Sequence, residues 1–258
     1  MTVFLYTLKR SFRSWVNLVL ICVVPLGLVF LPRFGDYEMP FGFHLYSELV
    51  FFIAFFLIRA VAEDRGSGIL TRIAAAPITH FQYLSQTLLA YACLLLAQNT
   101  LMVIGGVLLH GNALGRPLRV LAAYWTFSLN TLAFCLAMCS LIRAREVAYS
   151  SCSFLIVFFA AIGGALWPTT TLPVFLKRLS MVSPMYWLHN ALRVVPGEGD
   201  QFALSLAVML LFALVFLLGT EIALPAALVG TVIELAPWVN DNIAIPLGVC
   251  STLFLMGL

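Results

Sequence analysis

The chain has 258 residues, of which 62% are hydrophobic and only 10% charged, and its 14 Lys and Arg residues outnumber its 11 Asp and Glu residues by three. Soluble globular domains carry about 25% charged residues, so this composition excludes a soluble protein and predicts an all-α integral membrane protein. A net charge of +3 spread along the chain does not indicate nucleic-acid binding, and the basic residues instead serve as topology signals.

The first 13 residues interleave basic side chains with Phe and Leu. The basic residues are Lys9, Arg10 and Arg13, and this pattern predicts an amphipathic helix at a membrane interface. Cations beside a first span favour the cytoplasmic side, so we expect a cytoplasmic N-terminus. No small-residue cleavage site follows the next apolar run, which predicts a retained membrane segment and not a cleaved signal.

Six apolar segments approach the length needed to cross a hydrocarbon core of about 30 Å. They are residues 14–31 (with a possible kink at Pro25), 45–61, 83–109, 120–142, 147–166 and 202–218. Alternation from a cytoplasmic N-terminus places eight Lys and Arg residues inside and six outside, a weak bias in the expected direction. Glu48 and Arg59 lie on nearly the same face of the second segment but near opposite ends, so they are not expected to pair.

Residues 62–81 join the second and third segments and combine charge with helix-breaking residues. Glu63, Asp64 and Arg65 form a charged edge, and Gly66 and Gly68 permit a tight reversal. The pattern predicts a loop that begins on the cytoplasmic face of the membrane.

Within that loop, residues 69–76 predict a short helix that Pro77 ends, because proline cannot continue a helix. Helical spacing would give it an apolar ridge with a polar flank for a partner. The ridge consists of Ile69, Leu70 and Ile73, with Thr71 and Arg72 beside it.

Two more short helices are predicted after the fifth segment. Pro168 and Pro173 interrupt any continuing helix, and residues 174–181 and 185–194 then suit amphipathic helices too short to span. We expect both to be external, re-entrant helices in the outer interface. Trp167, Tyr186 and Trp187 would anchor them there.

Polar residues inside the apolar segments are costly, so they face either protein or a water-filled path. Gln98 and Asn99 on the third segment and Asn130 on the fourth therefore either form interhelical hydrogen bonds or line a substrate path. Gly163 and Gly164 near the end of the fifth segment have two similar interpretations. They either let the helix bend and re-enter beside that path, or allow close packing.

The sequence contains no catalytic constellation. Lys9 and Lys177 are the only lysines and neither lies in a Gly-rich phosphate loop, so the chain is not expected to hydrolyse ATP alone. Six cysteines fall in apolar runs, which predicts neither a disulfide framework nor a metal site. The histidines fall in loops or at membrane ends, far apart, and are expected to be solvated at the interface: His44, His80, His110 and His189.

Three motifs together resemble the membrane subunit of ATP-binding cassette exporters of the ABC-2 (type 2) permease family. Residues 63–79 carry the charged edge, G-x-G-I-L-x-R-I and P-I-T; residues 163–193 carry G-G-x-x-x-P, L-P-x-x-L, S-P-x-x-W and A-L-R. The basic amphipathic N-terminus resembles the family's connecting helix. The resemblance covers residues 1–220.

The resemblance implies a six-span half-transporter in the inner membrane. It would dimerise with a second copy or a homologous permease and be driven by separate nucleotide-binding subunits that bind ATP and Mg²⁺. The chain itself would be no enzyme and bind no cofactor. The implied ATPase-coupling residues, with residues 69–76 as the coupling helix, are Glu63, Asp64, Arg65, Gly68, Ile69, Leu70, Thr71, Arg72, Ile73 and Pro77.

Some details of the resemblance bear on the substrate and the docking surface. The G-I-L-x-R form and the lack of a large external domain are similar to the drug and antibiotic exporters of the family. This similarity implies export of an amphiphile (drug, antibiotic or lipid-like) by alternating access. Thr71 departs from the pattern, since many members carry an acid there.

Residues 221–258 depart from the family as an apolar tail of one or two membrane segments, which divides the chain into 1–13, 14–220 and 221–258. V-G-T-V-I-E-L and D-N-x-x-x-P-L in this tail are similar to the end of the polyprenol and phytol kinase family. One alternative is therefore lipid-linked phosphotransfer that depends on Asp241 and Asn242. A second is a membrane partner that binds an ATPase without transporting.

Overall fold

The structure is a computed structural model that describes residues 2–13, 15–32, 39–66, 80–142, 144–166, 173–193 and 199–234. Within these ranges the regular elements are all helical, which confirms the all-α prediction. Five helices are long and apolar enough to cross a membrane: Phe41–Val61, Gln82–His110, Pro117–Leu141, Glu146–Gly163 and Gln201–Gly219.

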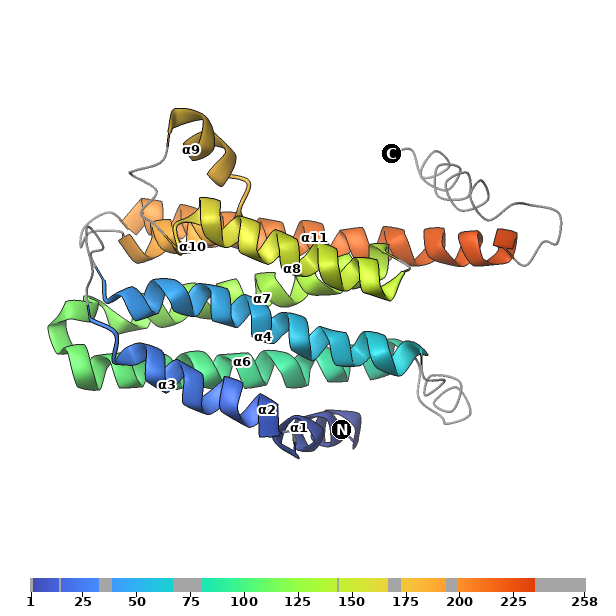
Figure 1. Ribbon diagram of the computed structural model, residues 1–258, viewed down its shortest axis with the longest axis horizontal. Coiled ribbons are helices and arrows are strands. Elements are labelled where there is room, and N and C mark those ends of the chain that lie inside the picture. Colours follow the sequence, from blue (N-terminus) through green and yellow to red (C-terminus); the bar gives the residue numbers. More distant parts are fainter. Residues whose placement is uncertain are drawn as a thin grey trace.

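The helices run up and down one elongated bundle (Figure 1). In chain order they are α1 (Thr2–Arg13), α2 (Trp15–Leu18), η1 (Val19–Val23), α3 (Val24–Val29), α4 (Phe41–Gly66), α6 (His80–His110), η2 (Gly111–Leu114), α7 (Pro117–Leu141), α8 (Arg145–Gly163), α9 (Val174–Ser180), α10 (Pro184–Arg193) and α11 (Gly199–Glu234).

The alternation of the helices gives the bundle two distinct ends. One end carries η2, α9 and α10 and is termed the α10 end; the other carries the final turns of α4 and the turn between α7 and α8, with α1 nearby, and is termed the α1 end (Figure 1). These two names are used below to say where each residue lies along the bundle.

The first apolar segment is not one continuous helix. It consists of α2, the π-helical turn η1 and α3, and Pro25 lies in the first turn of α3. Proline cannot donate to the carbonyl four residues earlier, and its ring would clash with that carbonyl in a regular helix. The wider π turn directly before Pro25 accommodates this loss, so the structure agrees with the expected kink.

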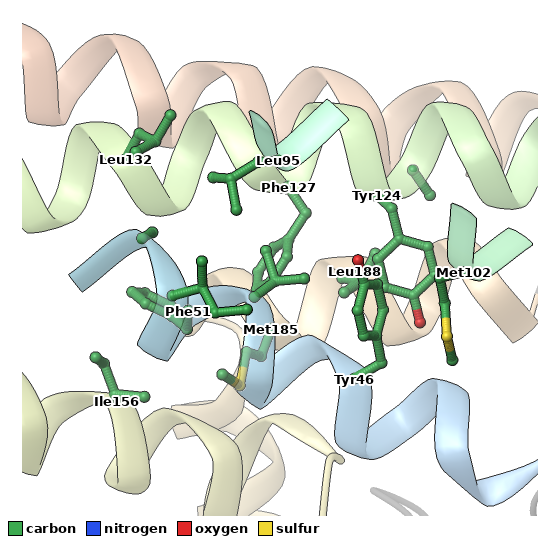
Figure 2. Close-up of a cluster of buried hydrophobic side chains, with 14 of the residues drawn as sticks. Tyr46, Phe51, Leu95, Met102, Tyr124, Phe127, Leu132, Ile156, Met185 and Leu188 are labelled. Carbon is green, nitrogen blue, oxygen red and sulfur yellow. The ribbon is translucent and has the colours of Figure 1, made fainter. Parts of the chain in front are cut away.

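The core lies between α4 and α7 and is dominated by aromatic rings. Phe51 of α4 is fully buried and meets Phe127 and Phe134 of α7 edge to face, with ring centroids 5.8 and 5.2 Å apart. Figure 2 shows Phe51 and Phe127 beside Tyr46 and Tyr124 in the same cluster. Inside a membrane such close packing holds helices together through dispersion and ring geometry.

Gly163 and Gly164 end α8 and bring α10 onto it. A Cβ on Gly163 would lie 2.7 Å from the Cβ of Met185 in α10, and Gly164 has a φ of 100°, a conformation that favours glycine. Of the two interpretations of these glycines, the structure shows close packing of α8 against α10. Helix α8 ends at Gly163, and re-entry beside a substrate path stays a prediction.

The two short helices after α8 form as predicted, but they differ in burial. α9 is largely exposed, whereas Met185 and Leu188 of α10 are fully buried. α10 packs against α7, α8 and α11. The bundle itself covers the apolar face of α10, and the interfacial position expected for the two helices stays a prediction.

The last helix is longer than the predicted span of residues 202–218. α11 continues without interruption to Glu234 and passes beyond the ends of α7 and α8 (Figure 1). The first apolar run of the tail thus extends α11, while residues 235–258 lie outside the described residues.

Candidate functional site

The charged edge at the α1 end is helical. Glu63 and its two charged neighbours lie in the last turns of α4, which ends at Gly66, so the predicted loop starts later than expected. Ala60 and Ala62 precede the charges, and Ala, Glu and Arg all favour helix, whereas Gly66 does not. Glu63, Asp64 and Arg65 therefore belong to the last helical turns of α4 and not to a loop.

Arg59 links α4 to α8 at this end. Its Nε donates to Oε1 of Glu63 at 2.8 Å, and its guanidinium lies 4.9 Å from the ring centroid of Tyr149. About half of both charged side chains is exposed, so the ion pair contributes only about 0.5 kcal/mol. Its effect is to orient Glu63, and Glu48, which was not expected to pair with Arg59, lies near the other end of α4.

The amphipathic helix at the N-terminus is confirmed as α1. Thr7 and Ser11 are buried, and the backbone N–H of Phe4 donates to Oε1 of Gln86 in α6 at 3.4 Å. Leu5 and Tyr6 are exposed together with the basic residues Lys9, Arg10 and Arg13. α1 therefore packs on α6 through small polar residues and presents an apolar and basic face outward.

The remaining proposed coupling residues, from Gly68 to Pro77, lie outside the described residues. So do Asp241 and Asn242 of the tail. The predictions for both sets stand as made.

Asn99 joins three helices in the core. Its Oδ1 accepts from the Tyr46 hydroxyl of α4 at 2.7 Å, and its Nδ2 donates to Ser128 Oγ at 2.7 Å and to the Tyr124 carbonyl of α7 at 3.1 Å. The Tyr124 hydroxyl donates in turn to the carbonyl of Phe43 at 2.6 Å. This set of hydrogen bonds, termed the Asn99 network, shows interhelical bonding at one of the proposed path residues.

The other proposed path residues do not join the Asn99 network into one polar surface. Asn130 Nδ2 donates to the Met209 carbonyl of α11 at 2.8 Å, and Gly163 and Gly164 lie at the α10 end. Gln98 is buried, and neither of its amide atoms forms a hydrogen bond within the described part of the chain. A substrate path through these residues stays a prediction.

Two of the histidines form a buried pair at the α10 end, which the sequence analysis missed. The rings of His44 in α4 and His189 in α10 stack with centroids 5.0 Å apart, and both residues are buried. The expectation that all four histidines are solvated and far apart is therefore wrong for these two. The two histidines meet because α10 packs against α4, which is far from it in the sequence.

His189 connects α10 to two other helices. Its Nδ1 lies 2.9 Å from the Gly163 carbonyl, and because a carbonyl only accepts, Nδ1 carries the proton. Its Nε2 therefore accepts and lies 3.3 Å from Ser47 Oγ, whose single proton is shared between Nε2 and the His44 carbonyl at 2.6 Å. The imidazole thus connects the end of α8 and the first turns of α4 to α10.

Acidification should weaken the fold through His189. Burial lowers the pKa of His189 from 6.5 to about 4, against the opposing effect of the hydrogen bond to Gly163. Between these values the unfolded chain binds the proton more readily, so the free energy of unfolding falls as pH falls from about 6.5 to 4, by up to about 3 kcal/mol. Thermal unfolding in detergent across this range measures the slope.

The matched variants for this prediction are His189→Gln and Asn190→Ala. His189→Gln should reduce the pH dependence, and the buried His44 beside it should retain the remainder. Asn190→Ala changes the residue next to His189 in α10. It removes a hydrogen bond to Ser205 of α11 at 3.0 Å but no titratable group, so it should keep the slope. Equal slopes in wild type and His189→Gln would contradict the assignment.

A bundle of membrane-crossing helices with an N-terminal amphipathic helix is a multi-pass membrane protein. The family model described as ABC-2 family transporter protein matches residues 14–220. This match spans most of the chain, so the chain belongs to the ABC-2 transporter family, and the resemblance in the sequence is confirmed. A comparison with curated proteins found no match. As a family member, the chain is a membrane subunit of an ABC transporter, a class that works with an ATPase subunit.

Proposed function

We propose that this chain is the permease subunit of an ATP-driven exporter that moves an amphiphilic substrate, such as a drug, antibiotic or lipid-like molecule, out of the cell. Two permease chains, identical or homologous, would enclose the path and alternate between inward and outward access. Separate ATPase subunits would bind ATP and Mg²⁺. The family match supports the transport role.

The arrangement of the α1 end supports the position of the ATPase. The exposed Arg59–Glu63 pair, the exposed apolar and basic face of α1 and the turn between α7 and α8 are on this side of the bundle (Figure 1). Residues 67–79 connect α4 to α6 here. We assign this end to the cytoplasmic side of the inner membrane and residues 69–76 to the coupling helix, because a rigid helix end can transmit the closure of an ATPase dimer.

The docking assignment predicts the effect of a charge on the apolar ridge. Ile73→Asp should abolish co-purification of the ATPase subunit while the permease still reaches the membrane, because an acid would be buried unpaired in an apolar groove. Ile73→Val keeps the ridge and should retain the ATPase. Unchanged co-purification with Ile73→Asp would remove the assignment.

The transport role is tested by purifying the tagged chain with its genomic neighbours co-expressed. A nucleotide-binding subunit that copurifies and shows substrate-stimulated ATP hydrolysis supports the exporter. A chain that purifies alone and phosphorylates an isoprenoid alcohol would contradict it. A cysteine at position 67 (Ser67→Cys) that reacts only from outside intact cells would reverse the proposed orientation.

A further inference from the structure

Helix α9 stands away from the bundle at the α10 end (Figure 1). Its Leu176 and Leu179 are half-buried and Ser180 is buried, so this side faces the protein. The opposite side is termed the α9 face and is exposed, with Val174 at 71% and Phe175 at 74%. The α9 face, which extends into the turn after the helix, consists of Val174, Phe175, Lys177, Arg178, Met181 and Val182.

The α9 face has two cations between two pairs of apolar side chains. Residues three or four apart share one side of a helix, so Lys177 and Arg178 lie between Val174 and Phe175 on one side and Met181 and Val182 on the other. Residues 173–193 contain no Asp or Glu. Among the described residues, none forms an ion pair with Lys177 or Arg178.

The charge pattern distinguishes between the surfaces that could cover this face. A second copy of the same face would bring four cations together without an acid between them, which repels. An anionic lipid matches both the cations and the apolar side chains of the α9 face. Its phosphate accepts hydrogen bonds from Lys and Arg, and its acyl chains cover the apolar side chains.

The surroundings of the α9 face are also suited to lipid. Leu108 in the last turns of α6 and Leu118 at the start of α7 are 79% and 78% exposed at the same end of the bundle. Exposed apolar side chains of the bundle therefore continue to the end at which α9 projects.

We propose that the α9 face binds an anionic phospholipid of the leaflet at the α10 end, with Lys177 and Arg178 on the headgroup phosphate and the four apolar side chains among the acyl chains. With the proposed orientation the α10 end is external, where basic residues are disfavoured, so two exposed, adjacent cations there have a local role. This role needs neither the ATPase nor the transported substrate. Its failure is therefore separate from failure of the exporter assignment.

Binding is tested by titrating the purified full chain in neutral detergent with fluorescent phosphatidylglycerol, and in parallel with fluorescent phosphatidylcholine. The wild type should bind phosphatidylglycerol more tightly. Lys177→Gln/Arg178→Gln should weaken that affinity about 30-fold, from about 1 kcal/mol per cation, and leave phosphatidylcholine unchanged. Met181→Ser/Val182→Ser should weaken binding of both lipids.

The control removes the same charge from the same end of the bundle. Arg116→Gln/Arg119→Gln changes the N-cap and first turn of α7, where the Arg119 guanidinium lies 5.4 Å from the ring centroid of Phe202, and should retain phosphatidylglycerol affinity. Equal losses in the two double variants would overturn the proposal in favour of general charge attraction. Unchanged phosphatidylglycerol affinity in Lys177→Gln/Arg178→Gln would also overturn the proposal, whatever the oligomeric state of the variant.

Discussion

Gly42→Ala should strongly destabilise the bundle, because α3 and α4 are in backbone contact at this glycine. A Cβ at this position in the first turn of α4 would overlap the carbonyl oxygen of Leu28 in α3 and lie 2.8 Å from its carbonyl carbon. Because the obstacle is backbone, no side-chain rotation relieves it, and α3 and α4 must separate. We expect a loss of about 3 kcal/mol in the free energy of unfolding, measured by thermal or denaturant unfolding in detergent.

Gly27→Ala is the matched control on the other side of this contact. A Cβ on Gly27 meets nothing within 4 Å, and alanine favours helix over glycine by up to about 1 kcal/mol. The control should therefore unfold at or slightly above the wild-type temperature. Similar midpoints for Gly42→Ala and Gly27→Ala would show that α3 does not approach α4 as closely as described.

The long helices could be predicted from the sequence because a bilayer fixes their length. The predicted span of residues 83–109 lies within α6 (His80–His110), and 120–142 nearly coincides with α7 (Pro117–Leu141). Charge marks where a helix leaves the hydrocarbon core, but it does not stop the helix. That is why α4 continues past Glu63 although the hydropathy pattern ends earlier.

The contacts of α10 could not be predicted, because they depend on tertiary packing. His44 and His189 are 145 positions apart, and Gly163 approaches Met185 only because α10 packs onto the end of α8. Spacing along the chain carries no signal for such pairs. The short, proline-bounded segments predicted the existence of α9 and α10 but not which of them the bundle buries.

The polar residues of the core were a similar case. The free-energy cost of exposing a polar side chain to lipid indicates that Asn99 faces either protein or a substrate path. No pattern in the sequence connects Asn99 to Tyr46 or Ser128. The choice depends on which residues of α4 and α7 stand opposite, which is a property of helix rotation. The coupling residues beyond Gly66 depend on a partner as well, so their assignment stays a proposal.

Asn99→Leu should lower the free energy of unfolding by about 2–4 kcal/mol. The substitution keeps a similar volume but removes three hydrogen bonds between α6 and its neighbours α4 and α7. Each interhelical bond in a membrane contributes about 0.6 kcal/mol and at most about 1.7, and the buried Tyr46 hydroxyl is left without its acceptor. Tyr46→Phe should cost about 1 kcal/mol, and the double variant should cost less than the sum of the two.

Gln98→Leu is the matched control, since it changes a neighbouring buried amide of the same helix. Gln98 makes none of the three hydrogen bonds of Asn99, so its replacement should cost much less stability than Asn99→Leu. Substrate-stimulated ATPase activity per folded complex then separates the two roles of the Asn99 network. Activity retained in Asn99→Leu fits an interhelical tie alone. A lost substrate response in folded Asn99→Leu would show that this residue also lines the path, and equal stabilities of Asn99→Leu and Gln98→Leu would contradict the network.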